Sequence, residues 1–174
     1  MTKLKTFKIA LEKFAKIVIA NSKQELKKQN KSVTGQLANS LGYEIDERAD
    51  SVILSFIDKM GDEGYADFVD KGVSGTEQKY NTPYSYKDKK PPAKNIIDWV
   101  RSRRFQFQDR TEGKKGRFLS YAQTGYIVRN SIFRKGIEPS LFFTTPFQKR
   151  LKDFPKDIFQ ELIVEIDDKL RRND

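Results

Sequence analysis

Two stretches of the chain decide its fold: residues 2–20, TKLKTFKIALEKFAKIVIA, and residues 51–57, SVILSFI. In the first stretch, apolar residues recur every three or four positions between lysines and glutamates, which predicts an amphipathic helix over residues 2–29. The second stretch is rich in β-branched residues and predicts a strand. The helix must bury one apolar stripe, made of Leu4, Phe7, Leu11, Phe14 and Val18. Burial of that stripe against the strand indicates an α+β fold.

Shorter patterns complete the expected fold. Residues 43–45 predict a second strand, which residues 46–50 join to residues 51–57 as an antiparallel hairpin. Residues 145–146, Thr-Pro, predict the start of a last helix, with a break or kink at Pro155. We therefore expect an α+β protein in which a small antiparallel sheet packs against long N- and C-terminal helices, with a helical and basic insertion. The buried stripe of the last helix is expected to comprise Leu151, Phe154, Ile158, Leu162, Ile166 and Leu170.

The composition excludes several kinds of site. The chain has 174 residues, of which 33% are charged, and it contains neither cysteine nor histidine. Disulfides, thiolate or imidazole metal sites and histidine-led catalytic triads are therefore impossible. No stretch approaches the roughly 20 apolar residues that a membrane-spanning helix needs. We expect a protein that is no enzyme, binds no cofactor and has no membrane partner.

The net charge of +10 is distributed in blocks of opposite sign. Residues 1–31 carry nine lysines against two glutamates, a net charge of +7. Residues 40–70 have a net charge of −7, and residues 86–117 have a net charge of +7. A simple nucleic-acid coat would be basic throughout. Alternating blocks fit either solvated faces or contacts between copies of the chain.

The length suits a single domain over residues 1–174, with an insertion at residues 73–117. The insertion comprises a long loop, a helix that begins after Pro91 and Pro92, and a basic segment at residues 101–117. The loop has few apolar anchors, so we expect it to stay mobile until a neighbouring subunit orders it. Residues 72–75, Gly-Val-Ser-Gly, at the start of this loop look superficially like a phosphate-binding loop, but no Lys-Ser or Lys-Thr pair follows them.

Basic residues of the insertion are the first candidate site. They alternate with Phe105 and Phe107, a combination that suits contact with phosphates and stacking on bases. The alternative is a solvated hairpin that becomes ordered against a neighbouring subunit, and we prefer it. The candidate contacts, to a subunit or to the DNA backbone, are Arg101, Arg103, Arg104, Arg110, Lys114, Lys115 and Arg117.

Acidic residues of the predicted hairpin are the second candidate site, here called the acidic set: Glu44, Asp46, Glu47 and Asp50. We expect the acidic set of one subunit to face the basic segment of the next. Carboxylates so close in sequence could also hold a hard cation, but the spacing of a calcium loop is absent. A polar turn explains them equally well.

The order of several motifs is similar to that of a known family. A long N-terminal helix comes first, followed by Thr-Gly-x-Leu-x-x-Ser from Thr34 and a strand pair. Next come Tyr-Ala-x-Phe-Val-x-x-Gly from Tyr65 and Pro-Pro at Pro91, which precedes Ile-x-x-Trp-Val. The last two motifs are Ser-Ile-x-x-x-Gly-Ile-x-Pro from Ser131 and Phe-Phe at Phe142. Over most of residues 1–155, this order resembles the tail-completion proteins (minor tail, neck or head–tail joining proteins) of tailed bacteriophages.

The resemblance implies a non-enzymatic structural protein of the virion, assembled in the host cytoplasm. Such a protein forms a homo-oligomeric ring in the neck or tail around the DNA conduit. Its partners would be neighbouring neck, portal or tail proteins, with possible transient contact to packaged DNA. The basic segment and the long last helix depart from the family pattern.

Two other functions remain as alternatives. A nucleic-acid-binding module would act through residues 86–117, and salt-dependent binding of DNA by the monomer would indicate it. A carboxylate-dependent nuclease would need Asp46, and loss of Mg²⁺-dependent cleavage in Asp46→Ala would reveal it.

Overall fold

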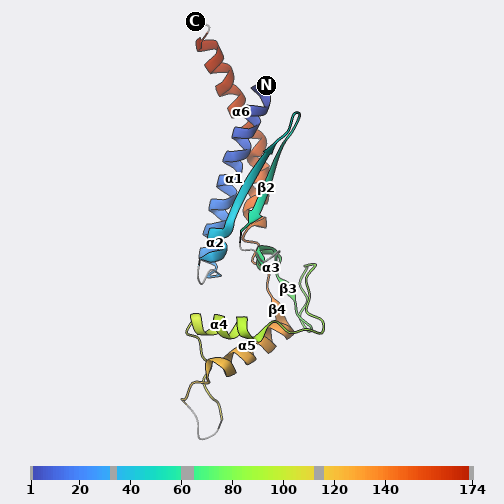
Figure 1. Cartoon of the computed structure of the whole chain (residues 1–174), viewed down its shortest axis with the longest axis vertical. Helices are drawn as coiled ribbons and strands as arrows, with labels where there is room; N and C mark the ends of the chain where they lie inside the picture. Colours follow the sequence, from blue (N-terminus) through green and yellow to red (C-terminus); the bar gives the residue numbers. More distant parts are fainter. Residues whose placement is uncertain (1, 32–34, 60–64, 112–115, 173–174) are drawn as a thin grey trace. The chain divides into compact units, whose positions relative to one another are not determined.

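The computed structural model divides the chain into two compact units (Figure 1). Unit 1 comprises residues 1–66 and 141–174, and unit 2 comprises residues 67–140. The structure describes residues 2–31, 35–59, 65–111 and 116–172. The insertion that the sequence predicts at residues 73–117 of a single domain over residues 1–174 lies wholly within unit 2.

Two long helices form most of unit 1: α1 (Thr2–Lys28) and α6 (Thr144–Arg172). They lie side by side and run in opposite directions (Figure 1). Leu11, Phe14 and Val18 of the predicted α1 stripe are buried. The centroid of the Phe14 ring lies 5.7 Å from that of Phe147 and 5.0 Å from that of Phe154. The prediction that the α1 stripe is buried is therefore confirmed for these residues.

The hairpin of unit 1 consists of β1 (Leu41–Glu47) and β2 (Val52–Asp58), preceded by the short helix α2 (Gln36–Ser40). Opposite residues alternate between the two faces of the hairpin: Tyr43 pairs with Phe56, and Glu44 pairs with Ser55. The Phe56 ring lies 6.3 Å from the Phe14 ring, whereas Glu44 and Ser55 are exposed. A small antiparallel sheet against long terminal helices is the α+β fold that the sequence predicts.

The helix α6 differs from the sequence prediction at both of its prolines. It begins at Thr144, so Pro146 lies in its first turn, where a missing N–H loses no helical hydrogen bond. It also continues through Pro155 without interruption. Pro155 removes one hydrogen bond of the helix, but the neighbouring Phe154 packs against Phe7 with a ring distance of 6.0 Å. Because the helix is continuous, the predicted break is wrong, whereas a kink at Pro155 stays a prediction.

Unit 2 is built around the helices α4 (Ala93–Ser102) and α5 (Tyr121–Lys135). The helix α5 begins at a capping box, in which Ser120 Oγ accepts from Gln123 N and Gln123 Oε1 accepts from Ser120 N. Gly125 allows close approach of the two helices, since a Cβ at this residue would lie 2.6 Å from Ile97 Cγ1. The remaining elements are α3 (Tyr65–Lys71) and the paired strands β3 (Val73–Ser74) and β4 (Gly136–Ile137).

The long loop that follows β3 is held by hydrogen bonds within unit 2. Ser74 N donates to Tyr84 O over 2.8 Å, and Tyr86 N donates to Ser74 O over 2.9 Å. Ser74 Oγ accepts from Tyr80 N and donates to Tyr80 O, at 3.0 and 3.2 Å. These bonds favour a loop that is ordered without a neighbouring subunit, in contrast to the sequence prediction, and proteolysis of the monomer tests which of the two holds. Polar groups anchor it, and hydrophobic patterning does not detect such anchors.

Candidate assembly and nucleic-acid interfaces

The basic segment begins at the C-terminus of α4. Arg103 N donates to Trp99 O over 3.0 Å, and the Arg103 guanidinium carbon lies 6.0 Å from the Trp99 ring centroid, within the range of a cation–π contact. Arg101 pairs with Asp98 at 3.3 Å. Arg104 is exposed and has a φ of 52°, which turns the chain away from the helix. Arg101 and Arg103 thus already have contacts inside unit 2.

The rest of the basic segment folds back on itself as a hairpin-like loop. Leu119 N donates to Phe107 O over 2.8 Å, and Asp109 N donates to Arg117 O over 2.7 Å. The two sides of the loop are therefore antiparallel, with Arg110 and Arg117 exposed on it. The other two predicted contacts, Lys114 and Lys115, lie outside the described residues.

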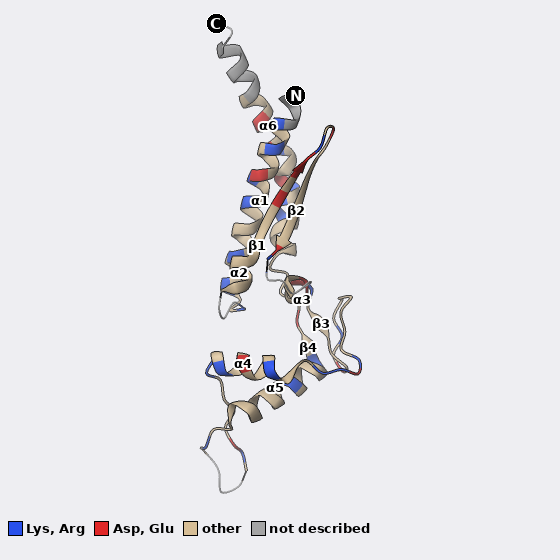
Figure 2. Cartoon of the chain, viewed as in Figure 1, with Lys and Arg blue, Asp and Glu red and all other residues tan. Residues whose placement is uncertain are grey.

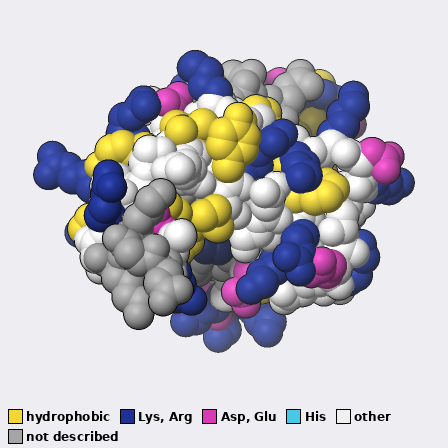
Figure 3. Space-filling view, turned by 90° about the horizontal axis from the view of Figure 1, so that it is seen from below, with side chains coloured by type: hydrophobic (Ala, Val, Ile, Leu, Met, Phe, Trp, Pro, Cys, Tyr) yellow, Lys and Arg dark blue, Asp and Glu magenta, His cyan; other side chains and the backbone are white. Residues whose placement is uncertain are grey.

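Exposed aromatic side chains accompany these arginines. Phe105 and Phe107 pack edge to face at 4.9 Å, yet 40% and 36% of their surfaces remain exposed. Trp99 and Phe118 are exposed as well. Figure 3 shows a face of the molecule on which hydrophobic side chains lie between lysine and arginine side chains. Rings between positive charges suit either base stacking or the apolar centre of a protein interface.

The acidic set lies on the hairpin of unit 1, where strand alternation divides its three β1 members between two faces and Asp50 is exposed in the turn (Figure 2). Glu44 and Asp46 lie on the outer face, the one opposite to that of Phe56. Glu47 lies on the other face and pairs with Lys8 of α1, and this hydrogen bond raises the pKa of Lys8. The acidic set is therefore only partly available to a neighbour.

The same alternation of side chains argues against a metal site or a nuclease site in the acidic set. Asp46 and Glu47 lie on opposite faces, and Asp46 pairs with Arg48 at 3.0 Å. Within the described ranges, no group of three or more Asp or Glu residues could hold a metal ion. The carboxylates of Asp46 and Glu47 do not converge on one site.

The segment Gly72 to Gly75 packs against the end of α5. A Cβ on Gly75 would lie 2.1 Å from Arg134 O, so only glycine fits at this residue. Glu77 N donates to Arg134 O over 2.9 Å, which provides a partner for a carbonyl that the helix leaves unpaired. Arg134 Nε donates to Glu77 Oε1 over 2.6 Å, and this bond lowers the pKa of Glu77. The glycines here serve close backbone packing.

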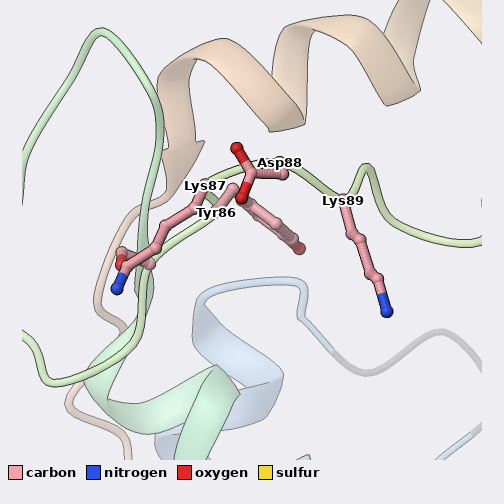
Figure 4. Close-up of a pocket in the computed structure, with 5 residues that line it drawn as sticks. Tyr86, Lys87, Asp88 and Lys89 are labelled. Carbon is pink, nitrogen blue, oxygen red and sulfur yellow. The ribbon is translucent and has the colours of Figure 1, made fainter.

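A shallow pocket lies along the loop that leads to α4 (Figure 4). Five consecutive residues line it: Ser85, Tyr86, Lys87, Asp88 and Lys89. Figure 4 shows Lys87 and Lys89 extending to opposite sides of Asp88. Because the charged groups diverge, this pocket offers no convergent set of contacts to a small molecule.

An exposed apolar surface on α6 was not predicted. Leu151, expected in the buried stripe, is exposed and begins a different row in which Pro155, Phe159 and Ile163 follow at intervals of four residues. We call these four residues the α6 stripe. Phe159 is 68% exposed and Ile163 is 64% exposed. The four-residue spacing is visible in the sequence, but a single buried row is enough to predict the helix, so the pattern does not indicate a role for a second row.

No family model, curated protein or solved structure matches the chain. Among the helices of the described residues, none has an apolar run sufficient to span a membrane. Function therefore has to be inferred from the charged and apolar surfaces of the two units.

Proposed function

We propose that the chain is a structural subunit of a tailed-bacteriophage virion that assembles into a ring in the neck or tail, around the path of the DNA. It acts by binding further copies of itself and the adjoining neck, portal or tail proteins, and it catalyses no reaction. The observation that carries this proposal is the set of large apolar side chains that a single chain leaves exposed.

These side chains occur in both units. Phe159 and Ile163 are exposed on α6, and Phe118 and Tyr126 are exposed in unit 2. Exposed apolar surface of this kind marks sites of protein association, because burying it removes it from water. An assembly of many copies would cover it.

The distribution of charge supports a ring over a symmetric pair. Exposed acidic side chains lie on the hairpin of unit 1, whereas exposed basic side chains lie on other surfaces, among them Lys152 and Lys156 of α6 and the arginines of the basic segment (Figure 2). Attraction between unlike surfaces of identical chains gives a head-to-tail contact, which closes into a ring when the rotation fits.

The resemblance to tail-completion proteins supports a place in the phage neck or tail. It depends on the order of motifs from Thr34 to the Phe-Phe pair at Phe142. Phe142 is fully buried, so this motif has a part in the core of unit 1.

Sedimentation and negative-stain microscopy of the purified full-length chain test the proposal. We expect concentration-dependent association into closed rings, and a tagged copy of the chain at the neck or tail of particles. A chain that stays monomeric at all concentrations, and is found in no particle, would contradict the proposal.

Binding of nucleic acid is the second candidate function. It is favoured by the exposed rings of Phe105 and Phe107 beside the exposed Arg104 and Arg110. Arginines neutralise phosphates, and each unpaired base has a face that can stack on an aromatic ring.

Fluorescence anisotropy with labelled single- and double-stranded DNA tests this function. We expect affinity to fall steeply with added salt, because bound cations are released from the phosphates. The double variant Phe105→Ala, Phe107→Ala should weaken binding of the single strand more than that of the duplex, and Tyr126→Ala serves as the matched control. Equal weakening of both forms would exclude stacking.

A further inference from the structure

We propose that the α6 stripe of one copy binds the outer face of the β1–β2 hairpin of the next copy. This inference rests on the proposed ring and names two surfaces that would form its subunit contact. Both surfaces belong to unit 1, so each can be described within a single compact body.

The α6 surface combines apolar and positive groups. Leu151, Phe159 and Ile163 are exposed in one row. Lys152 and Lys156 are exposed beside that row. Lys149 is exposed on this helix as well, and the half-exposed carboxylate of Asp153 lies 4.0 Å from Lys156, an exposed pair that contributes little and can exchange its partner. The surface therefore favours a partner that is apolar and acidic.

The outer face of the hairpin has this chemistry. Asp46 lies opposite Ile53, and Glu44 lies opposite Ser55. Ile53 is 38% exposed, and Glu44, Asp46 and Ser55 are exposed as well. Ile57 lies on the same face and is partly exposed. Apolar and acidic side chains thus occur together on one side of two paired strands.

The spacing of the two surfaces also agrees. Glu44 and Asp46 are two residues apart on a strand, about 7 Å, and Lys152 and Lys156 are one helical turn apart, about 6 Å. Ile53 and Ile57 are about 13 Å apart along β2, and Leu151 and Phe159 are about 12 Å apart along α6. A hairpin aligned with α6 can therefore place two acids near two lysines and two isoleucines near two large apolar side chains.

Other occupants of the α6 stripe match it less well. A second copy of the same helix surface would bring lysines where acids are needed. The basic segment would bring arginines, again of the wrong sign. The basic segment also offers the hairpin less apolar surface than α6 does. Phe105 and Phe107 bury part of their surfaces against each other, whereas 68% of the Phe159 surface is exposed.

The ion pair between Asp46 and Arg48 does not prevent this contact. Both side chains are 61% exposed, and exposed pairs contribute little to stability, so Asp46 can exchange its partner. The two surfaces differ, so the contact is head to tail, as a ring requires.

A charge exchange in the full-length chain tests the assignment. Lys152→Glu with Lys156→Glu should reduce self-association at least tenfold in sedimentation, and so should Glu44→Lys with Asp46→Lys. The chain that carries all four changes should associate as the original does. Failure of the combined variant to recover, with its circular dichroism spectrum unchanged, would overturn the assignment.

An apolar change provides a second test that does not depend on charge. Phe159→Gln should reduce self-association at least tenfold, while the matched control Ile127→Gln, at a residue of unit 2 that is 46% exposed, should not. Equal effects of the two changes would overturn the assignment.

The results separate this inference from the proposed function. If the unaltered chain forms rings that none of these changes weakens, the assigned contact is wrong and the ring proposal stands. If the unaltered chain never associates and is found in no particle, both are wrong.

Discussion

The ring of Phe14 in α1 lies 5.0 Å from the ring of Phe154 in α6, and the two planes are inclined by 58°. This contact joins helices from the two ends of the chain. Phe56 of β2 approaches the same Phe14 ring, with a centroid distance of 6.3 Å. Phe14 thus connects both helices and the hairpin, and only 3% of its surface is exposed.

Replacing Phe14 by alanine should lower the free energy of unfolding of unit 1 by about 3–5 kcal/mol, the usual cost of truncating a buried phenylalanine. Urea denaturation followed by circular dichroism measures this change. Ile17→Ala provides the control on the same helix, because Ile17 is 37% exposed and should lose much less. A loss below about 1 kcal/mol at Phe14 would mean that the α1 stripe contributes little to folding.

The main elements of unit 1 could be predicted because local sequence patterns indicate them. The α1 stripe repeats every three or four residues, and the bounds Thr2–Lys28 agree with the expected residues 2–29. The hairpin could be predicted from the β-branched residues of 51–57, although β1 (Leu41–Glu47) extends beyond the expected residues 43–45. The start of α6 and its continuity through Pro155 could not be predicted, because tertiary packing of Phe154 outweighs the local preference of proline.

Unit 2 was harder to predict because its order depends on polar contacts between distant residues. The strands β3 and β4 have two residues each, which is too short for any periodic pattern. The loop after β3 lacks apolar anchors but is held through Ser74. The charged candidate residues could be identified from the sequence. The ion pair between Lys8 and Glu47, which leaves Glu47 less available to a neighbouring copy, could not, because no sequence pattern indicates it.

Trypsin should cleave the loop after Lys79 slowly, because hydrogen bonds fix the residues on both sides of that peptide bond. Lys79 Nζ donates to Gly75 O over 2.7 Å, and Ser74 Oγ bonds both backbone groups of Tyr80. Ser74→Ala leaves those groups without this partner, which typically costs about 1–3 kcal/mol, so cleavage should become faster. Mass spectrometry of timed digests measures the rate. Cleavage of the unaltered chain at this bond before all others would show that the hydrogen bonds do not order the loop.

The ion pair between Glu77 and Arg134 should make the end of α5 sensitive to acid. The hydrogen bond from Arg134 lowers the pKa of Glu77 in the folded chain. Stabilisation by this pair is therefore complete above the pKa of an unfolded glutamate and is lost as the pH falls through the lower, folded pKa. In an NMR titration, Arg134→Gln should raise the pKa of Glu77 towards its ordinary value, whereas Arg110→Gln should leave it unchanged. An unchanged pKa in Arg134→Gln would show that the pair is absent in solution.

The arginines of the basic segment should act on DNA and not on subunit contact. Each phosphate contact that is removed should reduce the slope of log affinity against log salt by about 0.9. Reversing Arg103, Arg104 and Arg110 to glutamate should therefore reduce it by about 2, because Arg103 already packs on the Trp99 ring. Self-association should not change, because the proposed contact uses the lysines of α6 and the acids of the hairpin. Sedimentation and salt-dependent anisotropy on the same triple variant measure both quantities. Arg117→Glu alone tests whether the effect scales with the number of charges. If the triple variant binds DNA normally but no longer associates, the basic segment faces the acidic hairpin of a neighbouring copy, as the sequence alone suggests.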